Sequence, residues 1–263
     1  MTRSLAADLA YALDPVLFAR DVLDFDPDPW QGKFLGSPSR RILLNCSRQS
    51  GKSTTTAVLA THTALYQPGA LILLIAPAER QSKELFSKVA QFLKAVEPSV
   101  AMEEDNKKSA TLSNGSRIVA LPGDGRTIRG FSSPSLIVED EAAFVGDETH
   151  TSIRPMLAVG GGRLILMSTP NGRRGHFFDA WENGGPAWQR IKVRADECPR
   201  IAPEFLEDER ATLGDWRYRQ EYFCHFTDNN DQVFSFDEVM AALSDDEPLC
   251  IAPLVTTAWG ALT

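Results

Sequence analysis

A short polar segment, Asn45–Thr54, has the composition of a phosphate-binding loop. It follows an apolar run, precedes a helical pattern, and contains Gly51, Lys52 and Ser53 in succession. Backbone N–H groups of such a loop and of the following helix point at one anion. We expect the Lys52 ammonium to reach the terminal phosphates of ATP and the Ser53 hydroxyl to hold Mg²⁺.

The other loop residues are candidates for nucleotide contacts, although the pattern is imperfect. The usual motif has a glycine five places before Gly51, where this chain has Cys46. The position between a buried strand and a helix nevertheless favours phosphate binding. The remaining predicted nucleotide-binding residues of the loop are Ser47, Arg48, Gln49, Ser50 and Thr54.

A second group of polar residues ends the apolar run Leu136–Val138, which is followed by Glu139, Asp140 and Glu141. At the end of a buried strand, the Asp140 carboxylate is suited to bind Mg²⁺ beside the phosphate loop. Glu141 is suited to orient and deprotonate an attacking water. The alternative is a pair of carboxylates at an exposed strand end. Together with Lys52, the two carboxylates indicate nucleotide hydrolysis.

Ser168, Thr169 and Asn171 follow the next apolar run and could sense the γ-phosphate and couple its loss to movement. A simple Pro-Asn-Gly turn would explain the same residues, and both roles are compatible.

Two arginines are candidates for an arginine finger. Arg129 lies in a glycine-bearing segment and could act in its own site or a neighbour's, while Arg48 lies inside the loop. Upstream, Trp30 and Gln31 could hold adenine by ring packing and amide pairing, although without the phosphate loop a simply buried Trp30 would be the favoured interpretation.

The elements that must position these residues follow from apolar patterning. Continuous apolar runs predict buried strands of a parallel sheet at 42–44, 71–76, 136–138 and 163–167, with helices at 55–66 and 77–96. Such sheets bind ligands at the carboxyl ends of their strands. The remaining predictions are a helix over 5–23 interrupted at Asp14-Pro15, a turn-rich segment over 25–31, a hairpin over 106–121, an edge strand over 188–193 and acidic helices over 197–250.

Length and charge limit the possible organisation. A chain of 263 residues accommodates one large α/β domain with a smaller appendage. The net charge of −8 divides into −3 over residues 1–36, +6 over 37–195 and −11 over 196–263. The basic middle permits contact with a polyanion, and equally fits an ordinary solvated surface.

Nothing in the sequence predicts secretion or membrane insertion, so a soluble protein of the host cell cytoplasm, without a membrane partner, is expected. The four cysteines lack C-x-x-C spacing, which favours reduced thiols over a metal site.

In this order along the chain, several motifs resemble the large terminase subunit of tailed bacteriophages over about residues 29–236. They are Arg48–Ser53, Ile128–Gly130, Val138–Phe144, Ser168–Gly172 and Arg219–Tyr222. The resemblance implies an ATP-hydrolysing motor that translocates double-stranded DNA into a procapsid. It also implies a ring of identical subunits, with the portal protein and the small terminase subunit as partners.

The resemblance also implies a fold and a division of the chain. The expected fold is an α/β P-loop NTPase, RecA-like and of the additional-strand catalytic-glutamate class, with a mostly parallel central sheet flanked by helices. The expected parts are a helical, adenine-proximal segment (1–36), the P-loop ATPase core (37–195) and a small acidic helical linker subdomain (196–263). The family's C-terminal nuclease has no counterpart here, so nuclease activity is not predicted.

The resemblance assigns the same roles to Lys52, Ser53, Asp140 and Glu141, and it makes Arg129 a finger given to the adjacent subunit and Arg48 one acting in its own site.

Two other functions remain possible. A helicase-like DNA-dependent ATPase would need a second lobe, for which too few residues follow position 195. A nucleotide-gated DNA-binding adaptor with little turnover would not need Glu141.

Overall fold

The computed structural model describes residues 4–96, 102–227 and 242. Residues 4–227 of this part belong to one compact unit. Within the described residues, eight strands form one sheet in the order β3-β4-β5-β2-β6-β7-β1-β8. The strands are β1 (Arg41–Cys46), β2 (Leu71–Ala76), β3 (Met102–Asp105), β4 (Ser109–Leu112), β5 (Arg117–Pro122), β6 (Leu136–Asp140), β7 (Arg163–Ser168) and β8 (Gln189–Val193).

The six strands from β5 to β8 in this order pair in parallel, and only β3, β4 and β5 pair antiparallel. This mostly parallel sheet, with helices on its faces, confirms the predicted P-loop α/β architecture. The antiparallel pairing of β4 with β5 confirms the predicted hairpin, and β8 lies at the predicted edge.

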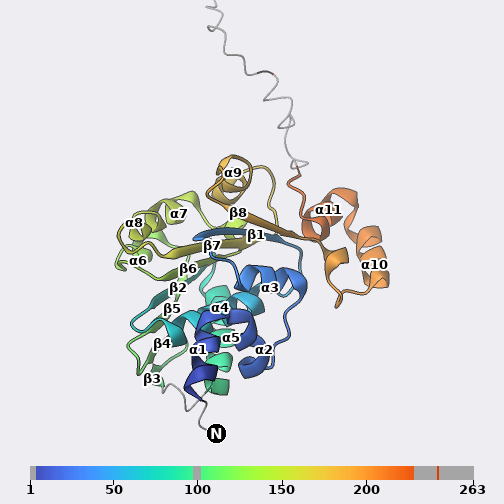
Figure 1. The fold of residues 1–263 in the computed structure, drawn as a ribbon. Helices are drawn as coiled ribbons and strands as arrows, with labels where there is room; N and C mark the ends of the chain where they lie inside the picture. Colours follow the sequence, from blue (N-terminus) through green and yellow to red (C-terminus); the bar gives the residue numbers. More distant parts are fainter. Residues whose placement is uncertain (1–3, 97–101, 228–241, 243–263) are drawn as a thin grey trace, which may run out of the picture. The chain divides into compact units, whose positions relative to one another are not determined.

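Helices cover both faces of the sheet (Figure 1). On one side lie α1 (Leu5–Leu13), α2 (Pro15–Leu23), α3 (Pro29–Leu35), α4 (Lys52–Tyr66) and α5 (Glu79–Val96). On the other side lie α6 (Gly125–Ile128), α7 (Asp147–Ile153), α8 (Met156–Gly160) and α9 (Gly175–Asn183). Beyond β8, the helices α10 (Pro203–Leu213) and α11 (Asp215–Phe223) pack together. Two short 3₁₀ helices in the described residues are η1 (Ala142–Phe144) and η2 (Ala195–Glu197).

The two faces of the sheet bury separate apolar clusters because side chains alternate along a strand. On β1, Ile42 and Leu44 pack under α2, α4 and α5, whereas Leu43 packs with Phe177 of α9. Burial on both faces explains why the central strands are continuous apolar runs in the sequence.

The prediction of a turn-rich segment over 25–31 was wrong for its last three residues, because α3 begins at Pro29. Proline is favoured in the first turn of a helix, where its missing N–H costs no hydrogen bond. Asp28 and Gln31 form a capping box, in which the Gln31 Oε1 accepts the Asp28 N–H at 2.8 Å. Asp28 and Pro29 therefore mark a helix start here.

Two other element boundaries differ from expectation. Helix α4 begins at Lys52 rather than Thr55, so the lysine belongs to its first turn. The predicted acidic helices are α10 and α11, separated at Gly214, which has φ +75°. The rest of the predicted segment, from 228 to 250, lies outside the described residues except for position 242. No helix among the described residues is long and apolar enough to cross a membrane.

Candidate functional site: a phosphate-binding loop facing a carboxylate pair

The phosphate-loop candidate connects β1 to α4. Gly51 caps the helix with φ +91°, a conformation that L side chains rarely adopt. Cys46, in the place of the usual first glycine, still belongs to β1 and does not have a positive φ. The chain therefore turns after Cys46, and the backbone does not require a glycine there. The thiol is fully buried, and burial raises its pKa far above the usual range.

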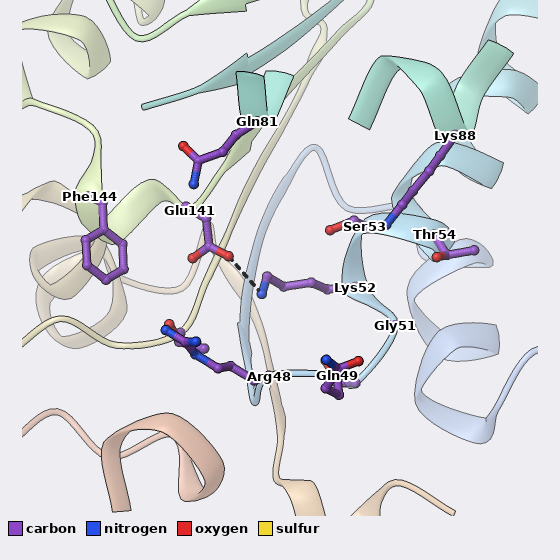
Figure 2. A pocket seen from close by; sticks show the side chains of 12 residues that line it. Arg48, Gln49, Gly51, Lys52, Ser53, Thr54, Gln81, Lys88, Glu141 and Phe144 are labelled. Atoms are coloured by element: carbon purple, nitrogen blue, oxygen red, sulfur yellow. Dashed lines mark ion pairs between the residues drawn. The ribbon is translucent and has the colours of Figure 1, made fainter. Parts of the chain in front are cut away.

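Lys52 and Glu141 meet across the site. The Lys52 Nζ lies 3.1 Å from the Glu141 Oε1 (Figure 2). Burial lowers the pKa of Lys52, but attraction to Glu141 and Asp140 outweighs it, so the net shift is upward and the ammonium stays charged. Glu141 itself has φ +50°, which is uncommon outside glycine. The structure thus brings together the two side chains on which the predicted chemistry depends.

Asp140 and Ser53 line a common cavity of about 340 Å³, together with Glu141. The Asp140 side chain accepts the Glu141 N–H at 2.9 Å and is 7% exposed. Burial, followed by the nearby charge of Glu141, raises the pKa of Asp140 to about 6. A buried carboxylate with a raised pKa favours a cation beside it, and a hydroxyl and a carboxylate are oxygen ligands suited to Mg²⁺.

A second cavity, of about 580 Å³, opens along the loop. Its lining includes Thr169 and every residue from Arg48 to Thr54. It also includes three residues to which the sequence analysis gave no role, Gln81 and Lys88 of α5 and Phe144 of η1 (Figure 2). Lys88 lines both cavities and lowers the pKa of Asp140 by its charge, although it does not offset burial. No motif in the sequence of α5 distinguishes Lys88 from a surface lysine.

The loop is held by residues distant in sequence. The Ser47 N–H donates to the Val193 carbonyl at 2.9 Å, and the Ser50 carbonyl accepts from the Arg200 guanidinium at 3.1 Å. Arg48 donates through its backbone N–H to the Glu221 carbonyl and through Nε to the Glu221 carboxylate at 2.6 Å. The bond to Glu221 raises the pKa of Arg48. Helix α11 therefore holds one predicted catalytic residue directly.

The segment after β7 contacts the acidic pair. The Ser168 hydroxyl donates to the Glu141 Oε2 at 3.3 Å, and the Asn171 amide donates to the Ala143 carbonyl at 3.3 Å. Thr169 lines the larger cavity. The three predicted coupling residues thus lie around Glu141 and the turn that follows it.

Six predicted site residues do not line the two cavities: Ser47, Ser168 and Asn171, whose contacts are given above, and Gln31, Trp30 and Arg129. Gln31 is buried against the loop, and a Cβ added to Gly51 would lie 3.0 Å from its Nε2. Trp30 is half-buried and packs on the core, and its indole N–H has no hydrogen-bond partner among the described residues. Their contact with adenine stays a prediction. Arg129 is exposed, and its Nε lies 3.3 Å from the Ser152 hydroxyl.

A glycine-capped loop between β1 and α4, facing a carboxylate pair at the end of β6, defines a P-loop NTPase fold of the RecA-like type. A family model described as "Terminase large subunit, T4likevirus-type, N-terminal" matches residues 43–240. The chain belongs to this family of terminase large subunits.

Individual relatives agree with the family. The large terminase subunit of Escherichia phage T5 is 27% identical over 212 residues, which are 76% of this chain and 47% of that protein. The corresponding subunit of Thermus virus P23-45 is 25% identical over 250 residues, covering 82% of this chain and 52% of the relative. The chain therefore spans about half the length of the curated relatives it matches.

Solved structures have the same fold. The large terminase ATPase domain of Thermus phage P74-26 superimposes with a TM-score of 0.71 at 21% identity, covering 79% of this chain and 97% of the domain. A large terminase from a thermophilic bacteriophage, solved in complex with ADP, gives a TM-score of 0.63 at 12% identity, covering 76% of this chain and 54% of the other.

Proposed function

We propose that this chain is the ATP-hydrolysing motor part of a DNA-packaging terminase and couples hydrolysis of Mg-ATP to translocation of double-stranded DNA into a procapsid. The observation that carries the proposal is the 3.1 Å contact of Lys52 with Glu141 at the mouth of the phosphate loop. Family membership supports the proposal, as do the ADP complex and the ATPase domain among the structural neighbours.

The chemistry follows from the groups around the cavity. Loop N–H groups and Lys52 bind the β- and γ-phosphates. The Glu141 carboxylate takes a proton from water while the water oxygen bonds to the γ-phosphorus. The bond from that phosphorus to the β–γ bridging oxygen breaks, and ADP leaves. Lys52 pairs with Glu141 in this structure, so an incoming phosphate must replace Glu141 as the partner of the Lys52 ammonium. The Glu141 carboxylate is then available to the attacking water.

The proposed metal ligands are Ser53 and Asp140, whose oxygens line one cavity. Bound Mg²⁺ would supply positive charge to the phosphate oxygens. The burial and raised pKa of Asp140 fit this role, because a divalent cation would relieve the cost of its buried negative charge. Through its hydrogen bond, Ser168 would respond to a change at Glu141 when phosphate is lost. It would transmit that change to the segment after β7.

The partners proposed are double-stranded DNA, the portal protein and the small terminase subunit, with the motor working as a homo-oligomeric ring in the infected host cell. These proposals rest on family membership, and the net charge of +6 over residues 37–195 is compatible with DNA binding.

The test is Glu141→Gln, which keeps the size of the side chain but replaces the carboxylate with a neutral amide that cannot act as the base. We expect ATP to bind within a few-fold of the parent affinity and turnover to fall at least about 100-fold, the range for loss of general base catalysis. Glu148→Gln, an exposed glutamate of α7, is the matched control and should retain turnover. Equal turnover in Glu141→Gln and its parent would exclude the assigned role. ATP binding with negligible turnover in the parent, even with DNA present, would favour a nucleotide-gated adaptor.

A further inference from the structure

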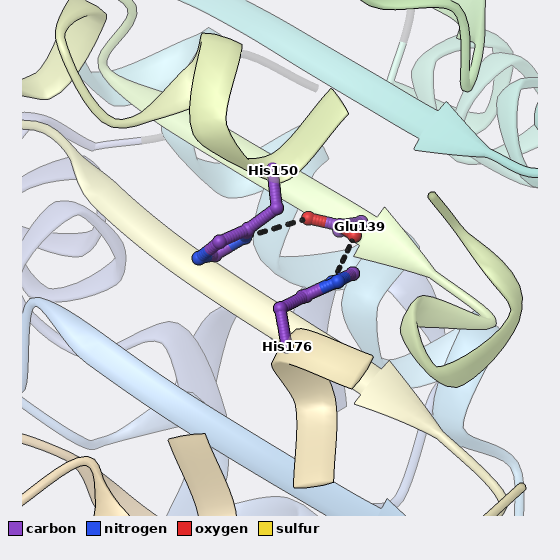
Figure 3. Close-up of side chains that lie close together, drawn as sticks. All are labelled: Glu139, His150 and His176. Atoms are coloured by element: carbon purple, nitrogen blue, oxygen red, sulfur yellow. Dashed lines mark hydrogen bonds and ion pairs between the residues drawn. The ribbon is translucent and has the colours of Figure 1, made fainter. Parts of the chain in front are cut away.

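A buried cluster of one carboxylate and two imidazoles lies on the other face of the sheet from the phosphate loop. Glu139 of β6 is 0% exposed. Its Oε1 lies 2.6 Å from the His176 Nε2 of α9, and its Oε2 lies 3.4 Å from the His150 Nδ1 of α7 (Figure 3). One potential ligand atom from each residue lies within 4.8 Å of the other two.

The two imidazoles are arranged alike. Their rings stack with centroids 4.3 Å apart and planes 12° from parallel, and their side chains are only 14% and 8% exposed for His150 and His176. Each ring therefore presents a nitrogen to the same buried carboxylate, His176 to its Oε1 and His150 to its Oε2.

A third side chain fixes the orientation of His176. The Asp147 Oδ1 accepts the His176 backbone N–H at 2.9 Å and lies 3.1 Å from the His176 Nδ1. When the Nδ1 carries the ring proton and donates it to Asp147, the Nε2 lone pair points to Glu139. A carboxylate on the outer nitrogen of a ligating histidine is a recurrent feature of zinc sites.

We propose that Glu139, His150 and His176 bind one divalent transition-metal ion, with Zn²⁺ as the best match, and that Asp147 positions His176. Two imidazole nitrogens and one carboxylate oxygen form an established donor set for zinc, with water as a fourth ligand. Imidazole donors disfavour Mg²⁺, which prefers oxygen, so this site is chemically distinct from the one proposed for Asp140 and Ser53.

A bound ion would lengthen the present contacts between the ligands. At zinc–ligand lengths of about 2.0–2.1 Å, the Glu139 Oε1 and His176 Nε2 would separate from 2.6 Å to about 3.3 Å in a tetrahedral site. The ligands come from β6, α7 and α9, so a bound ion would join three elements immediately behind the Asp140–Glu141 pair. Its expected effect is stabilisation of the folded chain, which grows with metal concentration.

The experiment titrates chelator-treated full chain with Zn²⁺ in competition with a chromophoric chelator. We expect one equivalent of tight binding and a rise in Tm. His150→Asn and His176→Asn should each weaken binding by more than 100-fold, and Asp147→Asn by about 10- to 100-fold. The other two histidines of the chain are matched controls, since His62 bonds to the Tyr11 carbonyl and His225 is exposed. His62→Asn and His225→Asn should bind zinc as the parent does.

A measurement on the unaltered chain tests the proposal even when a variant does not fold. Imidazole ¹⁵N signals of all four histidines are followed during the titration, and two, those of His150 and His176, should shift at one equivalent. Absence of stoichiometric binding would overturn the proposal, as would shifts at His62 or His225. Binding lost in Cys224→Ser but retained in His150→Asn would assign the zinc to thiols instead and also overturn it.

Discussion

Three consecutive side chains at the end of β6 have different environments, although all three are carboxylates. Glu139 faces two histidines, Asp140 faces the cavity shared with Ser53, and Glu141 pairs with Lys52. Glu139 and Asp140 alternate across the strand and reach opposite faces, while Glu141 leaves the strand in a left-handed conformation. The chemistry of each carboxylate is therefore determined by the direction in which its side chain points and by the residues around it.

The buried Asp140 predicts a specific dependence of stability on pH. Burial raises its pKa from 3.8 to about 6, so between pH 4 and 6 the folded chain binds more protons at this group than the unfolded chain does. The carboxylate therefore costs folding free energy that grows as pH rises through this window and is constant above it. In nucleotide-free, metal-free protein, Asp140→Asn should raise Tm at pH 7 and leave it nearly unchanged at pH 4.

Thermal unfolding of the parent and the variant from pH 4 to 8 checks this prediction. Asp179→Asn, an exposed aspartate of α9, controls for general charge effects. A stabilisation by Asp140→Asn that is equal at pH 4 and pH 7 would contradict the assigned cause.

At the residue scale, the sequence predicts the phosphate loop and the acidic pair because each is contiguous in the chain and follows an apolar run. The His150–His176 cluster was not predictable in this way, because its members are separated by long stretches and meet only when α7 and α9 pack on β6. Lys88 was missed for the same reason.

At the scale of elements, the predicted central strands are confirmed because burial on both faces leaves a continuous apolar run in the sequence. The short helices α6 to α8 and helix α9 were not predicted, since four to nine residues give little helical periodicity. The error at α3 arose because proline suggests a turn, whereas here it begins a helix.

Helix α11 gives a prediction at this scale through its contact with the loop. Glu221→Gln removes the charge that holds the Arg48 Nε at 2.6 Å. Since Arg48 is 63% exposed, the ion pair should contribute less than about 1 kcal/mol to the free energy of unfolding. Because Arg48 lines the larger cavity and is held there by Glu221, ATP turnover should fall about 10-fold, equivalent to about 1.4 kcal/mol of activation free energy.

Steady-state turnover and thermal unfolding are measured side by side. The control is Glu204→Gln, an exposed glutamate of α10. Unchanged turnover, or a large loss of Tm with the loss of activity, would show that α11 does not act through Arg48.

At the scale of the whole molecule, the fold class was predictable, but the strand order was not, because pairing between distant strands leaves no local pattern. The proposed division at residue 196 stays a prediction: Leu206, Tyr218 and Tyr222 form a small cluster of their own, but it includes Ala195 from the other side of that boundary. Residues 4–227 nevertheless form one compact unit, so a linker subdomain would act while packed on the sheet.

Arg129 gives a prediction for the assembled state. It is exposed and lines neither phosphate cavity, an arrangement that fits a finger donated to an adjacent subunit. Arg129→Ala should leave nucleotide affinity of the single chain unchanged and reduce turnover of assembled rings by about 10³-fold or more. Mixing it with Glu141→Gln should restore part of the activity, because an intact Arg129 then faces an intact Glu141. Full activity of Arg129→Ala rings would exclude the finger.

The position of β6 inside the sheet determines how reliably the Glu139 cluster is kept apart from the Asp140–Glu141 pair. Five residue pairs align β6 with β7 and four align it with β2, and Asp140 lies opposite Met167. A slip of β6 by one position would turn Asp140 under α7 and α9 and present Glu139 to the nucleotide. A strand that is hydrogen-bonded to neighbouring strands on both sides resists such a slip. The pairing of β6 therefore determines which carboxylate belongs to which site.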